Sequence, residues 1–126
     1  MKESIEIKKT IEDLAKNNDW RFGIYDIIRD RDGNICLNGI WSHNNNEIMN
    51  EIARKQDGNR KIDGIYKLAW IQSDKEICKQ GILIIEEINS MYTFEWKEKI
   101  YDEKPNYYGM GIEMNNQLVV FYLEQN

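Results

Sequence analysis

Residues 92–97 read Tyr-Thr-Phe-Glu-Trp-Lys, and residues 108–114 read Tyr-Gly-Met-Gly-Ile-Glu-Met. In both segments large apolar side chains alternate with polar or small ones, the period-two pattern of a strand with one buried and one solvated face. Asn115-Asn116 then turns the chain into a third apolar segment, residues 118–123. This part of the chain therefore predicts consecutive strands that are joined by short turns and pair antiparallel.

Four more strands are predicted upstream, in two hairpins. In the first, residues 21–28 and 34–41 flank the turn signal Asp30-Arg-Asp-Gly33. In the second, residues 63–71 and 76–86 flank Ser73-Asp-Lys75. The five strands from residue 63 onward then form an unbroken meander.

Two helices are predicted from apolar residues spaced three or four positions apart. Helix 4–17 has an apolar face that consists of Ile7, Ile11, Leu14 and Ala15. Helix 45–56 has an apolar face that consists of Ile48, Met49, Ile52 and Ala53. Asp57-Gly58 would end the second helix, because glycine accepts the left-handed conformation that often follows a helix.

An internal repeat connects these elements. Gly23-Ile-Tyr25 recurs 41 residues later as Gly64-Ile-Tyr66, and Ile35-Cys36 recurs 42 residues later as Ile77-Cys78. The two predicted helices are separated by the same interval, so the repeat indicates a duplicated helix–hairpin unit. The predicted fold is a single α+β domain over residues 1–126, with a curved antiparallel sheet of about seven strands and two helices.

Glycines within the strands favour strong curvature. Gly39, Gly81, Gly109 and Gly111 fall in predicted strands, where glycine marks a bend or a close approach of backbones. The pattern Gly64-x-Tyr66-x-Leu68-x-Trp70, followed by Gly81-Ile82 and Tyr108-Gly-Met-Gly111, resembles the strands of calycin-type barrels such as avidins and lipocalins, over residues 62–124. The resemblance implies a barrel-like sheet and a small-molecule carrier. Its ligand-binding interior would be lined by Tyr66, Trp70 and Trp96.

Composition argues against several partners. With 17 Lys and Arg against 22 Asp and Glu, the formal net charge is −5, which disfavours binding to a nucleic-acid backbone. No apolar run reaches the roughly 18 residues of a membrane span, and no apolar signal segment stands at residues 1–6. We therefore expect a cytoplasmic protein that binds neither nucleic acid nor membrane.

Motifs for chemistry are sparse. His43 is the single histidine, and Cys36 and Cys78 form no CxxC pair, so we expect no metal site. Gly109-Met-Gly111 lacks the third glycine and the following helix of a dinucleotide fingerprint. We therefore predict no catalytic residues, no cofactor and no enzymatic activity.

The segment 101–108, Tyr-Asp-Glu-Lys-Pro-Asn-Tyr-Tyr, combines acids with rigid amphipathic rings that suit protein contacts. It suggests a partner-binding surface of Tyr101, Asp102, Glu103, Tyr107 and Tyr108. The leading hypothesis is an acidic, non-enzymatic binding protein of the immunity or inhibitor type, which blocks a basic protein such as a toxin or nuclease. The alternative is the small-molecule carrier. A closed barrel with an open mouth would favour the carrier, and a filled interior would favour the inhibitor.

Overall fold

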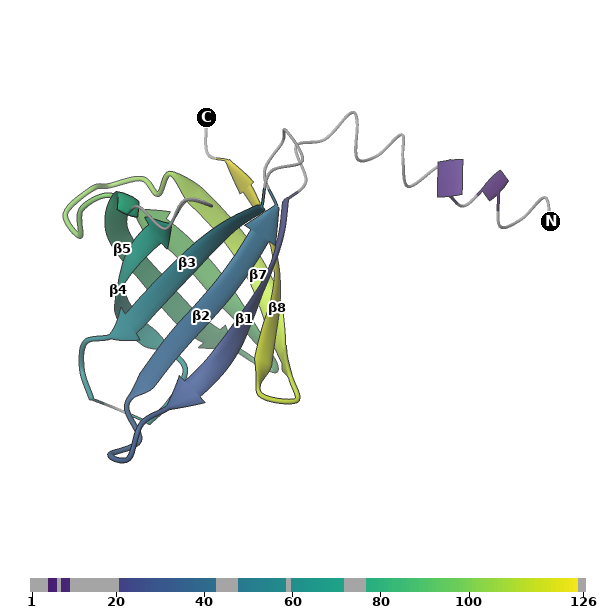
Figure 1. Cartoon of the computed structure of the whole chain (residues 1–126). Helices are drawn as coiled ribbons and strands as arrows, with labels where there is room; N and C mark the ends of the chain where they lie inside the picture. Colours follow the sequence, from purple (N-terminus) through teal and green to yellow (C-terminus); the bar gives the residue numbers. More distant parts are fainter. Residues whose placement is uncertain are drawn as a thin grey trace.

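The computed structural model describes residues 5–6, 8–9, 21–42, 48–58, 60–71 and 77–124, without the side chains of residues 77 and 78. Eight strands between residues 21 and 124 form a closed antiparallel barrel in which β8 pairs back with β1 (Figure 1). The strands, in sequence order, are β1 (Arg21–Arg29), β2 (Ile35–Ser42), β3 (Ile48–Lys55), β4 (Gly64–Ile71), β5 (Ile77–Ile88), β6 (Met91–Lys97), β7 (Tyr107–Met114) and β8 (Gln117–Glu124).

The predicted α+β class with two helices was wrong, because the barrel is all-β. The segment predicted as helix 45–56 contains β3, so the duplicated helix–hairpin unit fails as well. Most of the other predicted helix, 4–17, lies outside the described residues; residues 5–6 and 8–9 have helical backbone and exposed side chains. Within the described ranges, no helix is long and apolar enough to cross a membrane. The seven predicted strands are confirmed to within two residues at each end.

Strand β3 misled the prediction because its inward face is partly charged. Glu51 and Lys55 lie inside the barrel with Ala53, whereas the Ile48 side chain is 65% exposed on the outside. The apolar–polar alternation that identifies a strand is therefore absent from β3. Its isoleucines happen to fall at a helical spacing instead.

One end of the barrel is closed by the connection between β3 and β4, at the lower end of Figure 1. Ile62 from this connection is buried in the core. The Tyr66 hydroxyl donates a hydrogen bond to the Ile62 carbonyl at 2.5 Å, and the Lys55 ammonium donates one to the Lys61 carbonyl. We call this the closed end. At the opposite end, where the β6–β7 loop (residues 98–106) lies, the described residues include no buried connection, and we call it the open end.

Strand β7 presents its glycines, not its large side chains, to the interior. Gly109 and Gly111 are both buried, while the Met110 and Ile112 side chains point outward. The prediction that Met110 and Ile112 form the buried face was therefore wrong. A Cβ atom at position 109 would lie 2.3 Å from the Phe121 carbonyl oxygen, so β7 and β8 approach each other as closely as they do only because glycine stands there.

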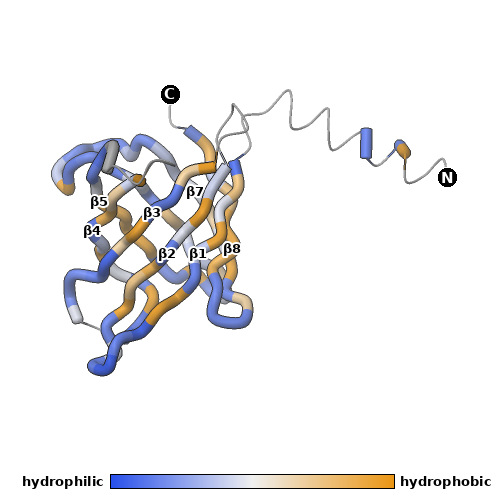
Figure 2. The backbone as a smooth tube through the Cα atoms, in the orientation of Figure 1, coloured by the Kyte–Doolittle hydropathy of each residue, from blue (hydrophilic) through white to orange (hydrophobic). Residues whose placement is uncertain are grey.

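The outside of β7, β8, β1 and β2 carries a row of apolar side chains in direct register. Ile112 pairs with Val119, Val119 with Ile24, and Ile24 with Ile40. A second row joins Met110, Phe121 and Phe22. We call this surface the apolar wall; it consists of Phe22, Ile24, Ile40, Met110, Ile112, Val119 and Phe121, each at least 36% exposed. Figure 2 shows apolar residues alternating with polar ones along the strands, and mostly polar turns and loops.

Candidate functional site

The open half of the barrel holds a small aromatic cavity. Its volume of about 10 Å³ gives room for about one water molecule. Among the described residues that line it, Glu51 is the one charged side chain, and the others are Tyr25, Trp41, Trp70, Trp96, Tyr107 and Tyr122. We call these six rings and Glu51 the aromatic cage. Since seven of the eight strands, all but β5, contribute to it, the closed sheet itself builds the site.

Register places Glu51 at the floor of the cavity. Tyr25 pairs with Gly39, Gly39 with Glu51, and Glu51 with Trp70, so these four residues form one row across β1 to β4. The Tyr25 ring lies across Gly39, where an added Cβ would come within 2.4 Å of the ring. The missing side chain at Gly39 therefore lets the Tyr25 hydroxyl reach the carboxylate two strands away.

Three neutral groups donate hydrogen bonds to the Glu51 carboxylate. The Tyr25 hydroxyl donates to Oε2, and the Trp70 indole Nε1 donates to Oε1 at 2.5 Å. The Trp96 Nε1 lies 3.4 Å from Oε2. Both oxygens are thus engaged, which is what a buried carboxylate requires. All three donors are uncharged, so the carboxylate's charge is solvated by dipoles alone.

Burial raises the pKa of Glu51 to about 7, although the hydrogen bonds from Tyr25, Trp70 and Trp96 act in the opposite direction. Burial also raises the pKa of Tyr25 well above its ordinary value, and the nearby Glu51 charge adds to that effect. The pKa of Tyr122 is raised by burial as well. Near neutral pH, Glu51 therefore changes its charge inside the cavity while these two phenols stay neutral.

Two cations already lie over rings of the cage. The Arg21 guanidinium lies 5.3 Å from the Tyr107 ring centroid, and its Nη2 atom lies 3.4 Å from Glu124 Oε2. The Lys79 ammonium lies 5.6 Å from the Trp70 ring centroid and 2.7 Å from Glu98 Oε1. Each of these cations therefore has a carboxylate partner of its own, separate from Glu51.

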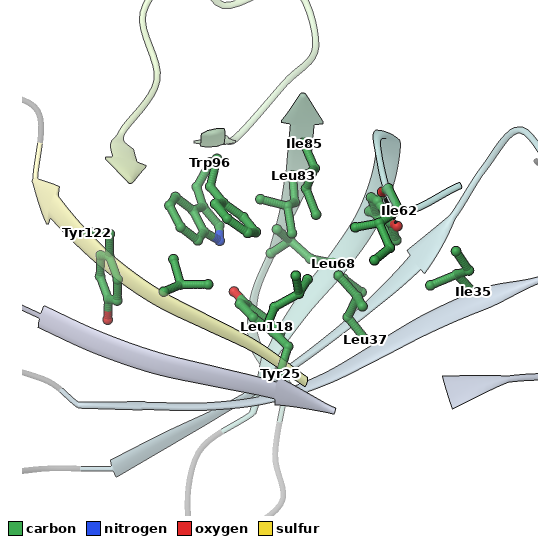
Figure 3. Packing of buried hydrophobic residues seen from close by; sticks show 14 of the residues in the cluster. Tyr25, Ile35, Leu37, Ile62, Leu68, Leu83, Ile85, Trp96, Leu118 and Tyr122 are labelled. Carbon is green, nitrogen blue, oxygen red and sulfur yellow. Dashed lines mark hydrogen bonds between the residues drawn. The ribbon is translucent and has the colours of Figure 1, made fainter. Parts of the chain in front are cut away.

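The cage is rigid inside and more accessible at its rim. The Trp96 ring centroid lies 5.3 Å from that of Tyr122 and 5.7 Å from that of Phe94, so the inner rings support one another. Figure 3 shows Trp96 and Tyr122 within the buried cluster. Trp41 and Tyr107 are only half-buried and each meets Tyr122 edge-on. These two rings form the mouth of the cavity.

The structure brings two of the three predicted ligand-binding residues together. Trp70 and Trp96 line the cage and both donate to Glu51. Tyr66 lies at the closed end, where its hydroxyl donates to Ile62, and it does not line the cavity.

The five residues predicted to bind a partner are divided among three places. Tyr101, Asp102 and Glu103 lie on the β6–β7 loop, where the Tyr101 side chain is 74% exposed. Asp102 accepts a hydrogen bond from the Lys99 backbone N–H at 3.0 Å and so helps to shape the loop. Tyr107 belongs to the cage, and Tyr108 points outward from β7.

Sequence reasoning missed Glu51, Tyr25, Trp41 and Tyr122 as members of one site. Glu51 was hidden because it fell within a predicted helix. A usable signal was present in the pairing of Tyr25 with Gly39, since a large ring opposite a glycine on an adjacent strand indicates a side chain that crosses the neighbouring strand.

Metal-binding chemistry has little support in the described part of the chain. There, no three or more His, Cys, Asp or Glu side chains are grouped so as to hold a metal ion. His43 lies outside the described residues, and Cys36 is a half-buried free thiol. Comparison with known proteins found no matching family model, no matching curated protein and no matching solved structure.

Proposed function

We propose that this protein binds a small molecule in the aromatic cage at the open end of its barrel. The observation that carries this proposal is the buried Glu51 carboxylate at the floor of a cavity whose other lining residues are six aromatic rings. Ligand sites combine apolar walls with a few well-placed polar groups that orient the ligand. Eight-stranded barrels are also wide enough to hold one small ligand.

The resemblance of residues 62–124 to calycin-type strands supports the same function. The closed meander supports it too, because a carrier needs a closed wall and an accessible mouth. The closed end is filled by side chains and the cavity is small, so we propose a ligand whose head group enters the cage. The rest of such a ligand would lie between Trp41 and Tyr107 at the mouth.

Tryptophan fluorescence tests this proposal, because Trp41, Trp70 and Trp96 line the cavity. Titration with a panel of small amines, acids and neutral compounds should give a saturable change with at least one class. Tyr107→Ala removes a ring of the mouth and should change that affinity by about tenfold or more. Tyr101→Ala, on the exposed loop, is the matched control and should leave it unchanged. A panel without any saturable response would contradict the proposal.

A second candidate is the acidic inhibitor of a basic protein, favoured by the nearly filled interior and by the exposed Tyr101 ring beside Asp102 and Glu103. The same two variants separate the candidates. If a basic partner is bound through the loop, Tyr101→Ala should speed its dissociation, measured by surface plasmon resonance, while Tyr107→Ala has little effect.

A further inference from the structure

The charges around the cage point to the kind of ligand that fits it. Among the described contacts, Arg21 is paired with Glu124, Lys79 is paired with Glu98, and Glu51 is held only by neutral donors. When Glu51 is ionised, the cavity therefore contains one negative charge that no cation of the described residues balances within hydrogen-bonding distance. A buried carboxylate in this state gains most from a positive partner.

The walls of the cavity favour the same sign of charge. Aromatic faces carry negative electrostatic potential and attract cations within about 6 Å of the ring centroid. Arg21 and Lys79 demonstrate this at two rings of the cage, Tyr107 and Trp70. A neutral or anionic head group would meet the same rings and the same carboxylate with no such attraction.

The size of the cavity limits the head group. A space of about 10 Å³ accommodates a group of about the size of water. A primary ammonium group meets this limit, whereas a trimethylammonium group would require the inner rings to move. Those rings are packed on Phe94 and on one another, so they resist displacement.

We propose that the aromatic cage selects a primary alkylammonium group, with the nitrogen against the Glu51 carboxylate and the alkyl chain between Trp41 and Tyr107. This inference rests on the proposed ligand-binding function and adds the ligand class. The ammonium could belong to a free amine or to a lysine side chain of a partner protein.

The test is a calorimetric and fluorescence titration of the intact chain at pH 8 with n-butylammonium and with 1-butanol, which has a similar length and no charge. The ammonium should bind at least tenfold more tightly than the alcohol. Tetramethylammonium should bind at least tenfold more weakly than n-butylammonium, because it is too large for the cavity. Glu51→Gln should weaken ammonium binding at least tenfold. Glu95→Gln, an exposed carboxylate on β6, is the matched control and should have no effect.

A pH series on the unmodified protein gives a readout that does not depend on any variant folding. Glu51 shares the cavity with three phenols and three indoles, and the Arg21 guanidinium lies over the Tyr107 ring. The alkylammonium group stays charged between pH 5 and 9. Since the pKa of Glu51 is about 7, the affinity should be constant above pH 7 and fall by up to tenfold per unit below it.

The outcomes separate the two proposals. If 1-butanol or tetramethylammonium binds as well as n-butylammonium, or the affinity is independent of pH, the ammonium class is wrong but a ligand site remains. If nothing in the wider panel binds, the proposed function fails as well. A tighter response to Nα-acetyl-lysine-methylamide than to n-butylammonium would identify a lysine side chain as the source of the ammonium, and the reverse order would identify a free amine.

Discussion

A single buried side chain, Glu51, dominates the chemistry of this molecule. It is 1% exposed and its hydrogen-bond partners come from three different strands. Replacing it with an apolar residue would leave the Tyr25 hydroxyl and two indole N–H groups without their acceptor, which is costly in a dry interior. Glu51 therefore belongs to the candidate site and also stabilises the open half of the barrel.

The stability of the protein should depend on pH through Glu51. Its pKa is about 7 in the folded protein, against an ordinary value of 4.5. Between these values the native state keeps a proton that the unfolded chain has released, so rising pH disfavours folding. The contribution of this group is greatest below pH 4.5, falls by about 3 kcal/mol up to pH 7, and is constant above.

Urea denaturation of the unmodified protein and of Glu51→Gln, at several pH values from 4 to 8, measures this effect. The free energy of unfolding of the variant, subtracted from that of the unmodified protein, should fall by about 3 kcal/mol over that range. The matched variant Glu95→Gln should show no comparable trend. A difference that is flat with pH would show that the pKa of Glu51 is not raised by folding.

At the scale of the strand, the glycines of β7 decide how the barrel closes. Gly109 and Gly111 take the interior positions, so β8 can lie close and the Phe94 and Tyr122 rings can occupy the space. The barrel is packed by pairing large rings on one strand with glycines on the next.

Gly109→Ala should therefore destabilise the barrel. The new Cβ would lie 2.3 Å from a backbone carbonyl oxygen, and backbone atoms cannot move aside cheaply. We expect a loss of about 1–3 kcal/mol in chemical denaturation. Gly23→Ala is the comparison, because its Cβ would meet the Trp41 side chain at 3.2 Å, and it should cost less. Equal stabilities for Gly109→Ala and the unmodified protein would contradict this close packing.

Most strands were predictable from sequence because their alternation is strong, as in Tyr92, Phe94 and Trp96 of β6. Strand β3 was not, because charged Glu51 and Lys55 take interior positions that alternation reserves for apolar residues. The prediction also assigned the wrong face of β7 to the interior. In the sequence, a glycine that makes room for a neighbouring ring cannot be distinguished from a small residue on the solvated face. Trp70 and Trp96 were predicted as ligand-binding residues. Their shared contact with Glu51 was not predictable, because it depends on the register between strands, and the pattern within one strand carries no information about register.

At the scale of the whole molecule, the barrel has apolar side chains on its outside as well as inside. The apolar wall crosses four neighbouring strands and is continuous in register. Isolated exposed apolar residues are common on protein surfaces, but contiguous patches of this kind are rare in monomers. Because the side chains of the apolar wall point outward, they can be replaced without altering the core.

Replacing Phe22 and Ile24 by serine and threonine should leave the fold intact and reduce binding of a hydrophobic dye. Both side chains point outward, with Phe22 60% and Ile24 48% exposed, so we expect a stability change below about 1 kcal/mol. Dye fluorescence, with Ile65→Thr on the outside of β4 as the control, measures the effect. Unchanged dye fluorescence would show that the wall does not act as one apolar surface.

The pairing of β1 with β8 also has a consequence for the kinetics of folding. Arg21 pairs with Tyr122 and Asp26 with Gln117, so the contacts that close the barrel join residues that are far apart in sequence. Hairpins such as β7–β8 need only a two-residue turn and can form early, but the closing seam must wait until both ends of the sheet meet. Folding of such non-local β topologies takes milliseconds to seconds. Until the seam forms, β1 and β8 each expose an unpaired edge, which makes the interval before closure the period in which the chain is most prone to aggregate.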